Sequence, residues 1–255
     1  SYYSPGSYFQ ERIAGISYFR LLEDLEKNFE QRREEVTENF RQLMKIIFRP
    51  ENLMVSVVTD GKGYENLEER VAGLKEELYT EEVPTGGICY RFEQKNEGFK
   101  TAGQVQYVAV GGNFREAGFA YTGALRILKV ILSYDYLWMN LRVKGGAYGC
   151  MCNFRRTGDS FLVSYRDPHL ARTLDVFRGT PDYLRSFAAD EHEMTKYIIG
   201  TISDLDVPMN PSAKGALALT AWMGGLTRQD LQKERDEILN ARPEDIRALA
   251  DLIEA

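Results

Sequence analysis

Apolar side chains in the N-terminal part of the chain recur at steps of three and four residues. Between residues 11 and 48, positions such as Leu21, Phe29 and Phe40 fall on one face of a helix, and Glu and Arg fill the other face. Pro50 ends this periodic stretch. The pattern therefore predicts a long amphipathic helix that follows an irregular segment over residues 1–9.

The next stretch changes from helical to strand-like patterning. Residues 53–59 (LMVSVVT) are rich in β-branched side chains and predict a strand. The G-K-G at residues 61–63 is too short for a phosphate-binding loop and predicts a turn before a helix over residues 67–79. Proline and glycine at residues 84–87 mark a boundary, which divides the chain into residues 1–83 and 84–255.

The second region predicts strands and helices in alternation. An alternating or β-branched pattern predicts strands over residues 104–110, 147–153 and 161–165, with a hairpin-like segment at 88–100 and turns at 111–114 and 156–159. Helical spacing predicts helices over residues 122–139, 171–187 (with a break near Pro181), 191–204, 213–224, 227–240 and 243–255. Thr227 suits an N-cap and Pro243 a first helical position. The region is therefore expected to be an α/β unit.

The two regions share an internal sequence similarity at a separation of 206 residues. The sequence DLEK at residues 24–27 is similar to DLQK at 230–233, and apolar positions within residues 40–47 match those within 246–253 at the same offset. A duplicated structural unit predicts one shared offset, and chance similarity between amphipathic helices is the alternative. The first copy continues into residues 53–59, whereas the second stops at Ala255. We therefore expect the end of one unit and most of the next.

Composition and charge exclude several classes of protein. The net charge of −6, with basic and acidic residues interspersed, argues against binding to nucleic acid. No run of about 18 apolar residues predicts a membrane span, and the N-terminus lacks the layout of a signal peptide. Cys89, Cys150 and Cys152 form no disulfide framework, which predicts a reducing compartment. Cys150 and Cys152 are expected to be small buried thiols, since a zinc site would need two more ligands nearby.

Common catalytic motifs are absent from the sequence. The two histidines, His169 and His192, lie too far apart for a zincin helix, and no G-x-S-x-G elbow is present. We expect His169 in a loop and His192 at a solvated helix start.

The stretch LRVKGGAYG at residues 141–149 is the strongest candidate for chemistry. Arg142 carries a permanent charge with a planar set of donors, Tyr148 offers a hydroxyl on a rigid ring, and Gly145 and Gly146 let the backbone approach a ligand closely. Together they could bind a peptide carbonyl and the oxyanion that forms from it. The alternative is a glycine turn with Arg142 paired to a carboxylate and Tyr148 in the core.

This stretch resembles the arginine-to-tyrosine signature in the C-terminal half of insulinase/pitrilysin-type zinc metallopeptidases, and most closely the presequence-protease-like subfamily. The resemblance extends through YDYLWMNLRVKGGAYGCMCNFRRTGDSFLVSYRDPHL, MTKYIIGTISDLDVPMNPSAKG and LQKERDEILNARPEDIRAL, and covers nearly all of residues 1–255. It implies four homologous units, each an α+β two-layer sandwich with helices packed on an antiparallel-rich sheet. Residues 1–83 would end the third unit and residues 84–255 would form most of the fourth.

The resemblance also implies a divided active site. Zinc would be held by an HxxEH motif in the first unit, which is absent here, so this chain is expected to bind no metal. Arg142 and Tyr148 would bind substrate and act in catalysis, with Gly145 and Gly146 lining the site. The implied function is substrate binding and oxyanion stabilisation in the C-terminal half of an endopeptidase of unstructured peptides, inactive without the zinc-bearing half.

Two other classes of function remain open from the sequence. One is a non-catalytic homologue that serves as a binding or assembly module for a peptidase partner, and the other is an unrelated helical scaffold. The expected partners are a peptide substrate and a zinc-bearing half on the same chain or a partner subunit, with neither nucleic acid nor membrane. A sheet edge left open could pair with another copy or with residues 53–59. The expected compartment is the cytoplasm, with a mitochondrial or plastid matrix as the alternative.

Overall fold

The computed structural model describes residues 2–83, 86–87, 89–90, 92 and 95–255, and the chain divides into two compact units. Unit 1 comprises Pro5–Arg91 and Met209–Gly225. Unit 2 comprises Tyr2–Ser4, Phe92–Pro208 and Leu226–Ala255. The predicted boundary at residues 83/84 between two homologous units stays a prediction.

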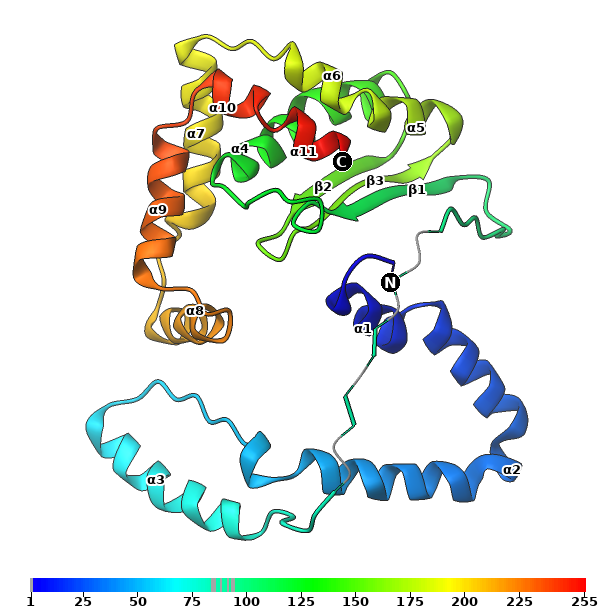
Figure 1. The fold of residues 1–255 in the computed structure, drawn as a ribbon, viewed down its shortest axis with the longest axis vertical. Helices are drawn as coiled ribbons and strands as arrows, with labels where there is room; N and C mark the ends of the chain where they lie inside the picture. Colours follow the sequence, from blue (N-terminus) through cyan, green and yellow to red (C-terminus); the bar gives the residue numbers. More distant parts are fainter. Residues whose placement is uncertain (1, 84–85, 88, 91, 93–94) are drawn as a thin grey trace. The chain divides into compact units, whose positions relative to one another are not determined.

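Unit 1 consists of helices joined by extended segments (Figure 1). Its elements are α1 (Pro5–Ala14), α2 (Ile16–Ile47), the 3₁₀ turn η1 (Pro50–Asn52), α3 (Gly61–Glu76) and α8 (Pro211–Met223). The long predicted helix is present, although α1 begins within the segment expected to be irregular. The expected G-K-G turn is wrong, because Asp60 caps α3 by accepting a hydrogen bond from the Gly63 amide at 2.8 Å.

The predicted strand at residues 53–59 is not formed. This segment carries no strand pairing, and no residue of unit 1 whose exposure the structure describes is buried. A strand needs a partner whose backbone groups satisfy its own, so β-branched composition alone does not produce one. Large apolar side chains such as Phe40 and Trp222 are correspondingly exposed.

Unit 2 is built on a three-stranded antiparallel sheet with the strand order β1-β3-β2. The strands are β1 (Gln106–Asn113), β2 (Gly149–Phe154) and β3 (Asp159–Asp167). β2 and β3 form a hairpin whose turn places Gly158 at φ +94° and pairs the Arg155 amide with the Asp159 carbonyl at 2.9 Å, as predicted. The predicted turn at residues 111–114 is wrong up to Asn113, since Gly111 and Gly112 continue β1 opposite Phe161 and Ser160.

Helices cover one face of this sheet within unit 2 (Figure 1). Alternate side chains, including Val108, Cys152 and Leu162, point into the core, whereas Tyr107 and Met151 on the other face are 63% and 52% exposed. The predicted two-layer α+β sandwich is confirmed. β1 and β2 each pair with β3 alone among the described residues, so pairing of an open edge with another copy stays a prediction.

The core helix does not follow a single helical period. It begins as α4 (Ala124–Ile131) and continues through two π-helical stretches, η2 (Leu132–Tyr136) and η3 (Trp138–Val143). A constant helical period from Leu125 through Leu132 would place Met139 on the buried face. The wider turns rotate that face, so Leu137 and Leu141 are 0% and 1% exposed while Met139 is 43% exposed. The helix therefore runs past its predicted end at residue 139 and carries Arg142.

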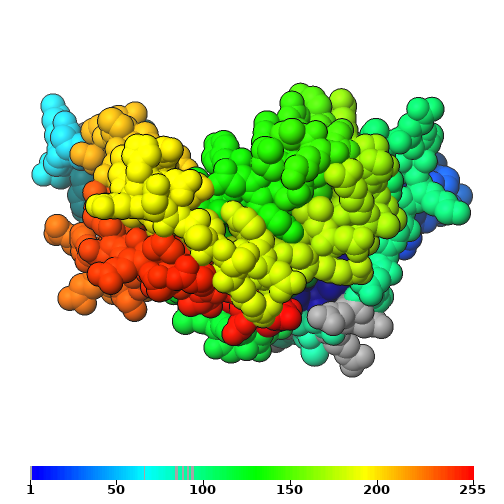
Figure 2. All heavy atoms as spheres, turned by 90° about the horizontal axis from the view of Figure 1, so that it is seen from above, coloured from blue at the N-terminus to red at the C-terminus, as the bar shows by residue number. Residues whose placement is uncertain are grey.

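The remaining helices of unit 2 complete the layer that covers the sheet. They are α5 (Ala171–Arg178), α6 (Thr180–Arg185), α7 (Glu191–Leu205), α9 (Arg228–Leu239), α10 (Pro243–Arg247) and α11 (Ala250–Glu254). Pro181 lies in the first turn of α6 and Pro243 begins α10, as predicted. The C-terminal α11, red in Figure 2, lies against α6, where Arg185 bonds Asp251 at 3.0 Å.

The predicted hairpin at residues 88–100 lies partly outside the described residues, and those described there form no strand. The internal sequence similarity relates residues of the single helix α2 to residues that form the separate helices α9, α10 and α11. Among the described residues, no helix combines the length and the apolar content needed to cross a bilayer.

Candidate substrate-binding site

The end of the core helix forms a tight turn that delivers the chain from Arg142 to Tyr148. The Gly146 amide bonds the Arg142 carbonyl at 3.0 Å, and the Ala147 amide bonds the Leu141 carbonyl at 2.9 Å. Each of these two nested hydrogen bonds spans one residue more than the corresponding bond of a Schellman cap, because the helix ends in the π-helical turn of η3. Gly146 takes the left-handed conformation at φ +78° that such caps require.

Gly145 is required in this turn for a steric reason. An added Cβ would lie 2.4 Å from the Leu141 carbonyl oxygen and 2.8 Å from the Asn140 carbonyl oxygen, so the backbone would have to shift. A Cβ at Gly146 would meet only the Pro168 ring, at 3.7 Å. The two glycines therefore act differently: Gly145 provides space and Gly146 provides backbone conformation.

We expect Gly145→Ala to lower the free energy of unfolding by about 1–3 kcal/mol, the range for forcing atoms into packed surroundings. Gly146→Ala should cost about 1 kcal/mol, from its left-handed backbone. Urea denaturation measures both, and Gly149→Ala is the matched control because a Cβ there meets nothing within 4 Å. A Gly145→Ala loss no larger than that of the control would contradict this account.

Arg142 is held in place by aromatic and backbone contacts. Its guanidinium carbon lies 4.7 Å from the centroid of the Trp138 ring and 5.5 Å from that of Tyr148. Its Nη1 donates a hydrogen bond to the Tyr148 carbonyl oxygen. The stacking and the hydrogen bond fix the plane of the guanidinium while leaving its charge unneutralised.

Tyr148 lies directly before β2 and has an exposed side chain. The Tyr148 amide donates to the carbonyl oxygens of Tyr165 and Arg166, at 3.1 and 3.3 Å, which anchors the backbone. The side chain is 63% exposed, and within the described part of the chain its hydroxyl makes no hydrogen bond. The alternative of a core tyrosine is therefore not what the structure shows.

Arg142 and Tyr148 line one shallow pocket of about 570 Å³, together with Val143, Gly146, Ala147 and Arg166. Arg142, Tyr148 and Gly146, predicted from the sequence, are thus brought together, whereas Gly145 is buried beneath the turn. Arg166 was not predicted. Its guanidinium carbon lies 5.8 Å from the Tyr148 ring centroid, and nothing in the local sequence distinguishes it from the other arginines.

The pocket is positively charged. Neither Arg142 nor Arg166 forms a salt bridge with a carboxylate of the described residues. A hydrogen bond to Tyr107 raises the pKa of Arg166, which holds that guanidinium in its charged form. The arrangement can therefore attract a carbonyl oxygen, an oxyanion or a carboxylate.

No described cysteine or histidine lines this pocket. Cys152 is buried and Cys150 half-buried on β2, and burial raises the pKa of each thiol to about 11. His169 is exposed in the loop after β3, and His192 is exposed in the first turn of α7, as predicted. Among the described residues, no three His, Cys, Asp or Glu side chains are grouped closely enough to hold a metal ion.

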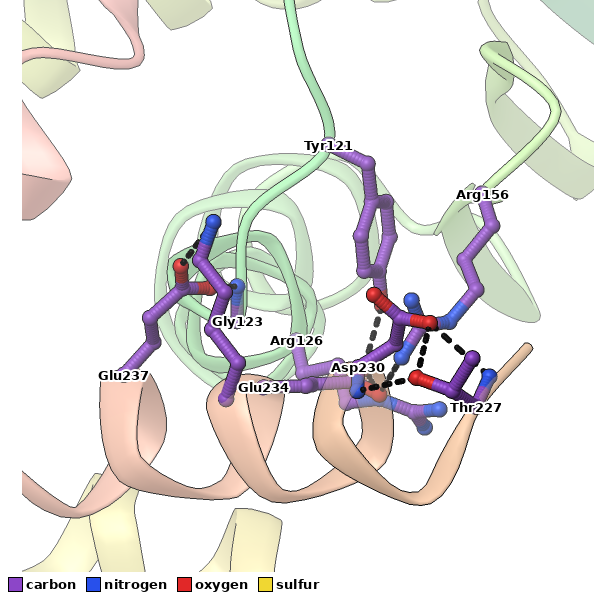
Figure 3. Close-up of polar contacts among 9 residues, drawn as sticks. Tyr121, Gly123, Arg126, Arg156, Thr227, Asp230, Glu234 and Glu237 are labelled. Carbon is purple, nitrogen blue, oxygen red and sulfur yellow. Dashed lines mark hydrogen bonds and ion pairs between the residues drawn. The ribbon is translucent and has the colours of Figure 1, made fainter.

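A buried carboxylate connects the hairpin of the site to the helical layer (Figure 3). Glu234 on α9 is 5% exposed and accepts hydrogen bonds from the Tyr121 hydroxyl at 2.6 Å and from Arg126 Nε at 2.5 Å. It also pairs with Arg156, in the turn between β2 and β3. At the start of α9, Thr227 and Asp230 form the capping box of this helix, as the sequence predicts for Thr227.

Comparison with known proteins extends what the fold and pocket indicate. Residues 96–255 match the family model of the PreP C-terminal domain. The chain is 41% identical over 253 residues to Protein HypA of Clostridium perfringens, covering 99% of this chain and 26% of that protein. It is 34% identical over 248 residues to Presequence protease 1, chloroplastic/mitochondrial, of Arabidopsis thaliana, covering 96% and 23%. With Presequence protease, mitochondrial, of Eremothecium gossypii the identity is 26% over 269 residues, covering 99% and 26%.

The fold and these matches support the class of C-terminal portions of pitrilysin/insulinase-type proteins. More specifically, because the family model matches more than half of its residues, the chain belongs to the PreP C-terminal domain family. The family resemblance predicted from the sequence is thereby confirmed. The chain spans about a quarter of the length of these curated relatives.

Proposed function

We propose that this chain supplies the substrate-binding half of a zinc-dependent endopeptidase that degrades unstructured peptides. In this role, Arg142 binds the carbonyl group of the peptide bond to be cleaved. The Tyr148 hydroxyl donates a hydrogen bond to the oxygen of that group as negative charge develops on it. Gly145 and Gly146 shape the turn that presents both side chains.

The observation that carries this proposal is the shared pocket of Arg142 and Tyr148. Arg142 is fixed by Trp138 and by a backbone carbonyl, so its charge is oriented before substrate arrives. Tyr148 is exposed, and its hydroxyl forms no hydrogen bond with any described residue. Donors that are fixed in advance stabilise a developing oxyanion without reorganising during the reaction, and one donor contributes about 3 kcal/mol.

The described residues do not fit a zinc site, because no metal-ligating group is assembled among them. We therefore assign the zinc of the proposed endopeptidase to a portion outside this chain, on the same polypeptide or on a partner subunit. The names of the two presequence proteases favour a mitochondrial or plastid matrix over the cytoplasm as the compartment.

Turnover of an unstructured fluorogenic peptide tests the proposal. We expect no hydrolysis by this chain alone or by the zinc-bearing portion alone, and hydrolysis when the two are combined. Circular dichroism of each portion confirms that an inactive sample is folded. Full activity of the zinc-bearing portion without this chain would contradict the proposal and favour a non-catalytic binding or assembly module.

A further inference from the structure

Arg166 has an unusual backbone conformation for its residue type. Its φ of +48° lies in the left-handed region, and it is the one described residue other than glycine with a positive φ. The pairing of β1 with β3 is irregular at the same place, because the register shifts between Gln106 and Val108. Such strain is maintained where the surrounding structure fixes it, and it concentrates at ligand-binding sites.

The irregular pairing positions Arg166 against the start of β2. The carbonyl oxygens of Tyr165 and Arg166 both accept from the Tyr148 amide. The Arg166 guanidinium carbon lies 5.5 Å from the Tyr165 ring centroid and 5.8 Å from that of Tyr148. The side chain is therefore held over the same tyrosine that Arg142 contacts from η3.

The charge of Arg166 has no acidic counterpart in the described residues. Arg126, Arg156 and Arg235 each pair with a carboxylate, so arginines of this chain commonly find one. Arg142 and Arg166 instead contact aromatic rings and share a pocket. Two guanidiniums on one tyrosine make a positive site in a chain of net charge −6.

We propose that Arg166 is a specificity-determining residue that binds a carboxylate of the peptide while Arg142 and Tyr148 hold the bond to be cleaved. This inference rests on the proposed function. A planar guanidinium binds a carboxylate through two parallel hydrogen bonds, a geometry that suits this group better than a neutral amide. The carboxylate belongs either to an Asp or Glu side chain or to the C-terminus of the peptide.

Matched peptides distinguish these two sources in the assembled peptidase. One series carries Asp or Asn in turn at each position flanking the cleaved bond, and another carries a free or an amidated C-terminus. We expect Arg166→Gln to lower the preference for Asp over Asn, or for acid over amide, about tenfold in kcat/KM. Arg166→Lys should retain part of that preference because it keeps the charge.

Ratios between matched peptides separate recognition from a structural role, since a folding defect lowers kcat/KM for both members of a pair. Arg172→Gln on α5 removes the same charge outside the pocket and should leave both ratios unchanged. Unchanged ratios in Arg166→Gln would overturn the inference. The proposed function is tested separately: if Tyr148→Phe leaves kcat unchanged, that function fails, whatever Arg166→Gln shows.

Discussion

Tyr148→Phe should lower kcat of the assembled peptidase by one to three orders of magnitude, about 10- to 1000-fold. The substitution removes one hydroxyl and keeps the ring that stacks with Arg142 and Arg166. If the hydroxyl stabilises charge that develops only in the transition state, kcat and kcat/KM fall together while KM changes little. Steady-state kinetics with one unstructured peptide measure all three quantities.

The structure supplies a sharp control for this experiment. Tyr134→Phe removes a hydroxyl from another exposed tyrosine, which lies on η2 outside the pocket. It should leave kcat within about twofold, the scale of a substitution that touches no reacting group. Because the Tyr148 hydroxyl bonds no described residue, Tyr148→Phe should also leave the unfolding midpoint unchanged. Unaltered turnover would remove Tyr148 from the mechanism and favour the binding-module alternative.

Short-range patterns predicted the parts of the fold that depend on local chemistry. The hairpin turn at Gly158 and the cap at Thr227 follow from residue types that suit those backbone conformations. Residues 53–59 show the opposite case. Their composition favours a strand, but strand formation depends on a partner elsewhere, which a local pattern does not reveal.

The core helix shows a second limit of sequence patterns. A constant period places Met139 on the buried face, but the π-helical turns bury Leu137 and Leu141 instead. No residue pattern in this stretch predicts the π-helical turns. These turns nevertheless set the site, because they bring Arg142 to the turn from which it contacts Tyr148.

The candidate site was predictable where its residues are adjacent in sequence. Arg142, the two glycines and Tyr148 lie within seven positions, whereas Arg166 reaches them through the pairing of three strands. Glu234 was missed for the same reason. In the sequence it lies in a charged helix, LQKERDEIL, and its burial depends on Tyr121, Arg126 and Arg156, which lie 113, 108 and 78 positions away.

Glu234→Gln should lower the free energy of unfolding by about 2–4 kcal/mol. The neutral amide keeps the size of the side chain but leaves Arg126 and Arg156 without the carboxylate that neutralises them (Figure 3). Their side chains are 40% and 28% exposed, so water offsets part of the loss. Asp206→Asn is the matched control, because its pair with Arg235 is exposed and should contribute less than about 1 kcal/mol.

The dependence of stability on pH separates this charge from simple packing. Burial raises the pKa of Glu234, but hydrogen bonds from Tyr121 and Arg126 outweigh burial and hold it below the usual 4.5. A carboxyl whose pKa is lower in the folded state stabilises the protein above its unfolded pKa. That contribution is lost as the pH falls through the folded value.

Urea denaturation at decreasing pH should therefore show a smaller loss in the free energy of unfolding for Glu234→Gln than for the wild type. An equal decrease of the free energy of unfolding with pH in the two proteins would contradict a stabilising role for the Glu234 charge. Because Arg156 lies in the β2–β3 turn, a confirmed result would mean that the hairpin bearing Tyr148 and Arg166 is fixed to α9 by this carboxylate.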